Sequence, residues 1–201
     1  MTTEVSPYCK RFPRKNTLLV VVHVTNAEQM CRNIHLVADC GAHGVFLVNH
    51  QSSANTILGD YQELLATKRL PKDFWIGVNC LDLEPAAAFR QVPHTIDGIW
   101  VDNAGIDERL MMQEEAYQIS RARKQSRWPG LYFGGVAFKR QRPVTDYATA
   151  ADRAKDWMDV VTTSGLDTGV AADISKVEKM RRAIGDFPLA LASGVTRENF
   201  K

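Results

Sequence analysis

The chain has 201 residues, of which 45% are hydrophobic and 24% are charged, and its formal net charge is +2. A chain of this composition can bury one sizeable core, so a single globular domain is the default expectation. The small net charge and the lack of a basic stripe interleaved with aromatic residues argue against nucleic acid or an anionic membrane as a partner. Small molecules remain as the expected ligands.

No CxxC spacing and no Cys/His metal pattern joins the four cysteines, Cys9, Cys31, Cys40 and Cys80. We therefore expect reduced thiols and a cytoplasmic protein. No apolar stretch approaches the ~20 residues that cross a bilayer, so membrane insertion is not expected. Residues 1–16 are predicted to be a basic, solvated tail, and residues 17–201 a single domain; the tail contains Lys10, Arg11, Arg14 and Lys15.

Seven apolar runs alternate with helical segments along the chain. Four of the runs begin at residues 18, 74, 131 and 187, which are 56, 57 and 56 residues apart. The other three lie between them, at residues 44–49, 98–103 and 159–164. The runs are continuously hydrophobic rather than alternating, which is typical of strands that are covered on both faces of a parallel sheet.

The intervening segments carry helix signals. Asn26 precedes a helix with Gln29 at the capping-box spacing, and Gly41 follows its apolar face. In the same way, Asp173 precedes a helix over residues 174–184, which Gly185 ends. A repeat of strands and helices can remain an open sheet or close as an eight-stranded barrel, and the regular period favours the barrel.

We therefore predict an α/β chain of the (β/α)8 TIM-barrel type, apparently truncated after strand 7. Four repeats that start at residue 18 would end near residue ~242, whereas the sequence stops at Lys201. Strands one and seven would then have open hydrogen-bonding edges, and we expect self-association through these edges.

In such barrels the functional groups come from the C-terminal ends of the strands. His23 could be a general acid or base, or a core histidine that is hydrogen-bonded to a neighbouring strand. Asp102 could be a general base, a metal ligand or a hydroxyl anchor, or it could cap the loop before Gly105. Lys139 could hold a phosphate or a carboxylate, or it could belong to a solvated loop with Arg140 and Arg142.

Other polar residues at the strand ends are candidate substrate ligands, namely Asn49, Asn79, Asn103, Thr163 and Ser164. His23, His50 and Asp102 could gather a divalent ion, but no HxH or HExxH spacing supports a metal site, and none is assigned. The sequence requires no cofactor.

Two glycine-containing loops are suited to phosphate. Strand six is followed by Gly165 and Gly169, and strand seven by Ser193 and Gly194. Glycines let backbone amides approach an anion, and helix N-termini add unpaired N–H groups. The alternative is that the glycines only permit tight turns, with Thr196 as a helix cap.

The segments at residues 158–169, 177–185 and 187–196 resemble the BtpA/SgcQ family, as do GVFLVNH at 44–50, GIWVDNAG at 98–105 and FGGVAFK at 133–139. This resemblance implies a TIM barrel that is related to phosphate-binding barrels. Members of the family are described as factors for photosystem I accumulation or as nucleosidase-like or sugar-metabolism enzymes. The ASGVT stretch at 192–196 is also similar to the phosphate loop of ribulose-phosphate-binding barrels.

The resulting hypothesis is an enzyme that acts on a phosphorylated small molecule, a sugar phosphate or a nucleotide-like compound, by general acid/base chemistry. Asp102, His23 and Lys139 are the expected catalytic groups. The alternatives are a non-catalytic assembly factor of the same fold and a truncated barrel without a complete site.

Overall fold

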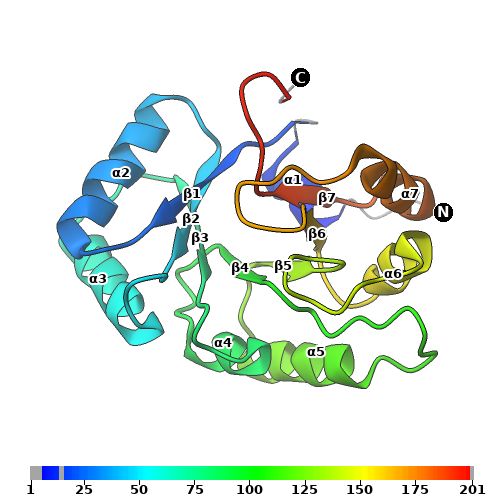
Figure 1. Ribbon diagram of the computed structural model, residues 1–201. Coiled ribbons are helices and arrows are strands. Elements are labelled where there is room, and N and C mark those ends of the chain that lie inside the picture. The colour runs from blue at the N-terminus through cyan, green and yellow to red at the C-terminus, as the bar shows by residue number, and fades with distance from the viewer. Residues whose placement is uncertain (1–5, 14–15, 200–201) are drawn as a thin grey trace. The chain divides into compact units, whose positions relative to one another are not determined.

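The fold is described from a computed structural model, which covers residues 6–13 and 16–199. In this part of the chain, seven strands form one sheet in sequence order, and a helix lies between each strand and the next. The predicted α/β architecture of the barrel type is therefore confirmed (Figure 1). The strands are β1 Leu19–His23, β2 Gly44–Val48, β3 Trp75–Asn79, β4 Gly98–Val101, β5 Leu131–Gly135, β6 Val160–Ser164 and β7 Leu189–Ala192.

The helices between the strands begin and end close to the predicted positions. Asn26 accepts a hydrogen bond from Gln29 N at 2.9 Å and so caps α2, as the capping-box spacing predicts. Asp173 caps α7 through the amides of Ser175 and Lys176. The helices are α1 Pro7–Arg11, α2 Ala27–Asp39, α3 Ala54–Ala66, α4 Pro85–Gln91, α5 Glu114–Ser126, α6 Tyr147–Ala154 and α7 Ile174–Ile184.

The expected basic tail contains α1, which Ser6 caps by accepting from Cys9 N. The next residue after this helix, Phe12, is buried. Two of the basic residues assigned to the tail, Arg14 and Lys15, lie outside the described residues. The tail as a whole stays a prediction.

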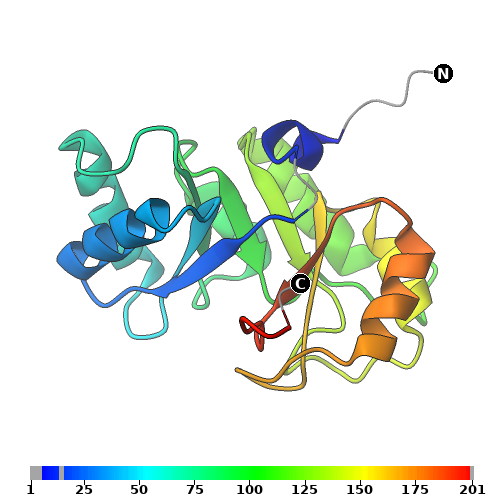
Figure 2. The same cartoon turned by 90° about the horizontal axis from the view of Figure 1, so that it is seen from above.

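The chain divides into two compact units. The first consists of Met1–Trp100 and Ser126–Leu131, and the second of Val101–Gln125 and Tyr132–Lys201. In the first unit, β1, β2 and β3 pair in parallel, and α2 packs against β1 and β2 (Figure 2). In the second unit, β6 pairs in parallel with β5 and β7, and α6 packs against α7. Whether residues 17–201 behave as one domain stays a prediction.

The core of the first unit is built around Trp75, the first residue of β3. Its ring meets Phe46 edge to face, with ring centroids 5.0 Å apart, and lies 5.6 Å from the ring of Phe12. A Cβ atom at Gly98 would lie 2.3 Å from the indole ring, so only glycine fits beside it on β4. The absence of a side chain at Gly98 therefore provides the space that this tryptophan fills.

The same pair of hydrogen bonds aligns three pairs of neighbouring strands. In each pair, the side chain of the residue just before β2, β4 or β6 accepts a hydrogen bond from a backbone amide at the start of the preceding strand. The backbone amide of the same residue donates to the carbonyl of the residue whose amide it accepts from. Three pairs share this exchange: Leu18 N to His43 Nδ1 at 3.1 Å, Ile76 N to Asp97 Oδ2 at 2.9 Å, and Tyr132 N to Asp159 Oδ2 at 2.7 Å. Asp159 also pairs with Arg123 at 2.5 Å.

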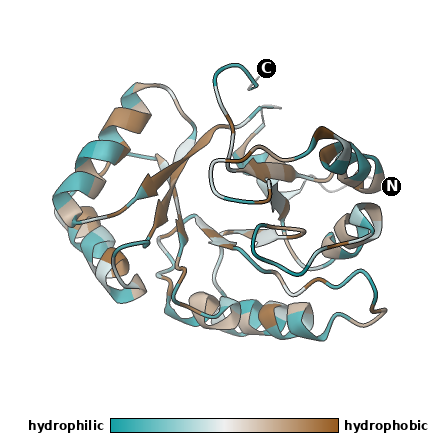
Figure 3. Ribbon diagram, in the orientation of Figure 1, coloured by the Kyte–Doolittle hydropathy of each residue, from teal (hydrophilic) through white to brown (hydrophobic). Residues whose placement is uncertain are grey.

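Hydropathy follows this architecture. The strands are mostly hydrophobic and several become polar at their C-terminal ends, as in β6 (VVTTS), whereas the helices combine hydrophobic and hydrophilic residues (Figure 3). The four cysteines are free thiols, and burial raises the pKa of Cys80 to about 12. Within residues 6–13 and 16–199, no helix is long and apolar enough to cross a membrane.

Candidate functional site at the strand ends

Two histidines lie together at the ends of β1 and β2 in the first unit. The rings of His23 and His50 have centroids 4.7 Å apart and are tilted by 45°. Both residues are exposed, and the carbonyl of His23 accepts a hydrogen bond from Gln29 Nε2 at 3.0 Å. Because His23 is exposed, it is not a core histidine. Its role as a general acid or base stays a prediction.

Asn49, at the end of β2, is engaged within the protein. Its Nδ2 donates to Asp82 Oδ1 at 2.5 Å, and its Oδ1 accepts from Leu81 N at 2.7 Å. Asp82 also accepts from Ala54 N at the start of α3. Burial raises the pKa of Asp82, but the hydrogen bonds from Ala54 and Asn49 outweigh this effect and hold the pKa below its usual range. Asn49 thus joins the loops after β2 and β3, and the neighbouring strand-end amide, Asn79, is buried.

In the second unit, Gln141 links the loop after β4 to the loop after β5. Its Nε2 donates to the carbonyl of Asp102 at 2.6 Å and to that of Gly135 at 3.1 Å, while its Oε1 accepts from Phe138 N. Asp102 is partly exposed. Asn103 accepts from Gly105 N at 3.0 Å in a local turn, which gives this predicted substrate ligand a structural role.

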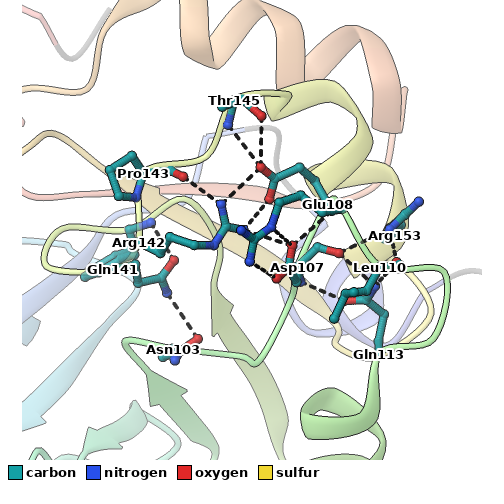
Figure 4. A network of polar contacts seen from close by, with 12 residues as sticks. Asn103, Asp107, Glu108, Leu110, Gln113, Gln141, Arg142, Pro143, Thr145 and Arg153 are labelled. Carbon is teal, nitrogen blue, oxygen red and sulfur yellow. Dashed lines mark hydrogen bonds and ion pairs between the residues drawn. The ribbon is translucent and has the colours of Figure 1, made fainter.

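An ionic network around the buried carboxylate of Glu108 continues from Gln141 (Figure 4). Arg142 donates to Glu108 Oε2 at 2.5 Å and to Asp107 Oδ1 at 3.0 Å. The Glu108 side chain is only 3% exposed, and it also accepts from the amide and hydroxyl of Thr145. The hydrogen bond from Arg142 lowers the pKa of Glu108 to about 2, despite its burial. The network ties the loop that follows Asp102 to the loop that follows β5.

Lys139 lies beside the loop after β6. Its Nζ donates to Thr168 Oγ1 at 3.1 Å, and its backbone amide donates to Ser164 Oγ at 2.8 Å. Ser164 is fully buried and donates to the carbonyl of Gly165, and Thr163 Oγ1 donates to the carbonyl of Ala137 at 3.3 Å. Ser164 and Thr163 are thus bonded within the protein, whereas Lys139 and Thr168 place an ammonium and a hydroxyl at a partly exposed position.

The two glycine-containing loops lie against each other. Ser193 Oγ accepts from Gly169 N at 2.6 Å. A Cβ atom at Gly194 would lie 2.2 Å from Ala171 N, and one at Gly165 would lie 2.2 Å from the carbonyl oxygen of Val170. Gly194 also has a φ of 65°, which favours glycine. The alternative that the glycines only permit tight turns accounts for this packing. Phosphate binding by the two loops stays a prediction.

Lys176 is a buried cation that the sequence reasoning missed. It lies in the first turn of α7, and its Nζ donates to the carbonyls of Ala137 at 2.5 Å and Ser164 at 2.7 Å. Burial lowers the pKa of this ammonium, and the charge of Asp173 acts in the opposite direction. Lys176 thus binds the backbone just after β5 and at the last residue of β6. A lysine in the first turn of a helix, three positions after its cap residue, gave no signal, because lysine side chains are ordinarily solvated.

Asp82, Glu108 and Gln141 were also not singled out from the sequence, and Arg142 was named only as part of a solvated loop, whereas it pairs with Asp107 and Glu108. The available signal was weak, namely polar residues a few positions after each strand. Among the described residues, no group of three or more His, Cys, Asp or Glu side chains is placed to hold a metal ion. The structure therefore suggests no ligand set for a divalent cation in that part of the chain.

Solved structures share this fold. They include a dipeptide epimerase from Enterococcus faecalis V583 (8% identity, TM-score 0.57, 88% of this chain and 47% of that chain). An enolase from Bradyrhizobium complexed with magnesium and mandelic acid is a second match (15% identity, TM-score 0.57, 89% of this chain and 46% of that chain). A mandelate racemase/muconate lactonizing enzyme from Roseiflexus sp. is a third match (12% identity, TM-score 0.55, 90% of this chain and 49% of that chain). The chain spans about half the length of these proteins.

These comparisons correct one expectation. No protein-family model matches the chain, and no curated protein matches it in sequence. The structural neighbours are epimerase, enolase and racemase proteins, so the resemblance to the BtpA/SgcQ family is wrong. Short apolar strand ends with Gly, Asn and Ser recur in many parallel barrels, and this explains how the resemblance arose. The assembly role that rested on it loses its support. At these identities the neighbours establish the fold alone.

Proposed function

We propose that the chain is a small-molecule enzyme that binds the phosphate of a sugar phosphate or a nucleotide-like substrate at the β5–β7 end of its second unit. The observation that carries the proposal is the contact between Lys139 Nζ and Thr168 Oγ1, 3.1 Å long. An ammonium beside a hydroxyl can offer two donors to one phosphate oxygen.

The internal hydrogen bonds refine how phosphate would bind. The amide of Gly169 is bonded to Ser193, and the amide of Thr196 to Asn199 at 2.6 Å. These two backbone donors are thus occupied, which favours recognition by the Lys139 and Thr168 side chains over recognition by a backbone cradle. Lys139 is therefore expected to contribute more to affinity than either glycine.

Asp102 is the proposed general base. It follows β4, it is partly exposed, and Gln141 holds its backbone carbonyl. A carboxylate at a strand end, on a backbone that a neighbouring side chain holds, suits proton transfer in a barrel of this type. Substitution of Asp102 by Asn removes the base while keeping the size of the side chain.

A thermal-shift titration tests phosphate binding. Inorganic phosphate and a pentose phosphate are titrated against the wild-type chain, Lys139→Met, and the matched control Arg140→Met, which removes an exposed neighbouring cation. A ligand at a hundred times its Kd stabilises the folded state by about 2.7 kcal/mol. We expect a shift for the wild type and the control and its loss in Lys139→Met. No shift for the folded wild type, or equal shifts in all three proteins, would refute the phosphate site.

Catalysis is tested separately. Asp102→Asn should keep the phosphate-induced shift and lose turnover of any phosphorylated compound that the wild type converts. Retained turnover in a folded Asp102→Asn variant would exclude Asp102 as the base.

A further inference from the structure

The buried Lys176 connects the two loops that carry the proposed phosphate ligands. Its side chain is only 8% exposed, which is rare for lysine. Nζ donates to the carbonyl of Ala137, two residues before Lys139. It also donates, at 2.7 Å, to the carbonyl of Ser164, four residues before Thr168. One ammonium thus holds the loop after β5 and the loop after β6 where each begins.

The turn at Ala137 depends on these donors. Ala137 has a φ of 49°, in the left-handed region that alanine rarely adopts. A backbone in this region persists when its surroundings hold it in place. The carbonyl of Ala137 accepts from Lys176 Nζ and from Thr163 Oγ1 at 3.3 Å. The bond from the ammonium is the stronger of the two, because its donor is charged.

This turn determines where Lys139 lies. The amide of Lys139 donates to Ser164 Oγ at 2.8 Å, and its Nζ donates to Thr168 Oγ1 at 3.1 Å. Ser164 is therefore bonded twice, through its carbonyl to Lys176 and through its hydroxyl to Lys139. If the turn at Ala137 opened, the ammonium of Lys139 would no longer be directed at the hydroxyl of Thr168.

Lys176 is itself held by two helices. It lies in the first turn of α7, which Asp173 caps. Its Nζ lies 5.6 Å from the centroid of the ring of Tyr147, the first residue of α6, and α6 packs against α7 (Figure 1). A cation over an aromatic face is attracted to it, and the attraction is larger where water is excluded. The ammonium is thus ordered without a ligand.

We propose that Lys176 is a positioning residue of the phosphate site, because it holds the Ala137 turn and the Ser164 carbonyl so that Lys139 Nζ and Thr168 Oγ1 converge. This inference rests on the proposed function, since it concerns the same site. Two of the three N–H groups of the Lys176 ammonium donate to carbonyls, and the side chain is buried, so it acts through Lys139 rather than on the ligand. Order that exists before binding lowers the entropic cost of binding.

Isothermal titration calorimetry with inorganic phosphate and with a pentose phosphate tests the inference. The temperature is one at which circular dichroism shows every variant to be folded. Lys176→Met removes the ammonium, and Lys176→Arg keeps a cation with several donors. Lys179→Met, at an exposed site on the same helix, is the matched control for charge. Asp159→Asn, at the opposite end of β6 from Thr168, is the control for a general loss of stability.

Lys176→Met should raise the Kd for both compounds about tenfold, because Lys139 must then be ordered by the ligand. Lys176→Arg should recover much of this loss, and both controls should bind as the wild type does. Amide hydrogen exchange is the second readout. Exchange at the Lys139 amide should be faster in Lys176→Met than in the wild type, and unchanged in Lys179→Met.

The outcomes separate this inference from the proposed function. Phosphate binding that Lys139→Met abolishes and Lys176→Met leaves unchanged would overturn the inference and keep the site. Equal losses of affinity in Lys176→Met and Asp159→Asn, or no recovery in Lys176→Arg, would also overturn it. A folded wild type that binds neither compound, or binding that survives Lys139→Met, would overturn both. If Lys176→Met does not fold, Lys176→Gln takes its place with the same expected result.

Discussion

The buried carboxylate Glu108 permits a quantitative prediction. Substitution by Gln keeps the shape of the side chain and removes the charge that Arg142 and Thr145 contact. The pKa of Glu108 is lowered from 4.5 to about 2. Such a difference corresponds to about 3 kcal/mol if it is fully expressed in stability. Because the Arg142 side chain is 35% exposed and solvent screens the pair, we expect Glu108→Gln to destabilise the fold by about 1–2 kcal/mol at pH 7.

The pH dependence has a defined sign. A carboxylate whose pKa is lower in the folded than in the unfolded state stabilises the fold above its unfolded pKa. This contribution is lost as the pH falls from about 5 through the folded value near 2. Urea denaturation at a series of pH values should therefore show the wild type and Glu108→Gln converging as the solution becomes acidic.

A matched control distinguishes the effect of a buried ion pair on stability from the effect of removing any surface charge. Glu178 pairs with Arg182 on the surface of α7, with both side chains more than half exposed. Glu178→Gln should change stability by less than about 0.5 kcal/mol. Equal effects of the two substitutions at pH 7, or a Glu108→Gln effect that does not depend on pH, would refute the proposed role of the Glu108–Arg142 network.

Three further substitutions test the core and the register contacts by urea denaturation. Trp75→Ala should cost about 3–5 kcal/mol, because it leaves a cavity beside Gly98, and a cost under 1 kcal/mol would contradict the packing described. Asp159→Asn should cost about 1–3 kcal/mol through loss of its charge, whereas Asp152→Asn, in an exposed pair, should be nearly neutral. Lys176→Met should cost about 1–3 kcal/mol, because two backbone carbonyls lose a donor, and an unchanged stability would show that water replaces it.

The sequence was a good guide to the elements of the fold. All seven strands lie within the predicted apolar runs. The prediction that both faces are covered is confirmed for β2 to β6, whose residues are all buried, but not for β1 and β7, which are partly exposed. The caps at Asn26 and Asp173 were also predicted correctly, since a cap depends on residues only two or three positions away.

The candidate site was predicted less completely. The rule that polar residues gather at strand ends led to Asp102, Lys139 and Asn49, but it could not tell which of them are engaged by other parts of the protein. Asn49 is held by Asp82, 33 residues away, and that partnership has no signature in local sequence. The family resemblance failed for a related reason, because similar strand ends occur in barrels of different ancestry.

The sequence by itself determined the order and type of the elements, because hydrophobic runs and helix caps act over a few residues. Only the tertiary structure revealed that Gln141 binds the backbone carbonyl of Asp102, that Glu108 is buried against Arg142, and that Lys176 binds the backbone at the ends of β5 and β6. These contacts join residues 12 to 39 positions apart. Their energies depend on burial and geometry, which arise only when the strands and loops pack together.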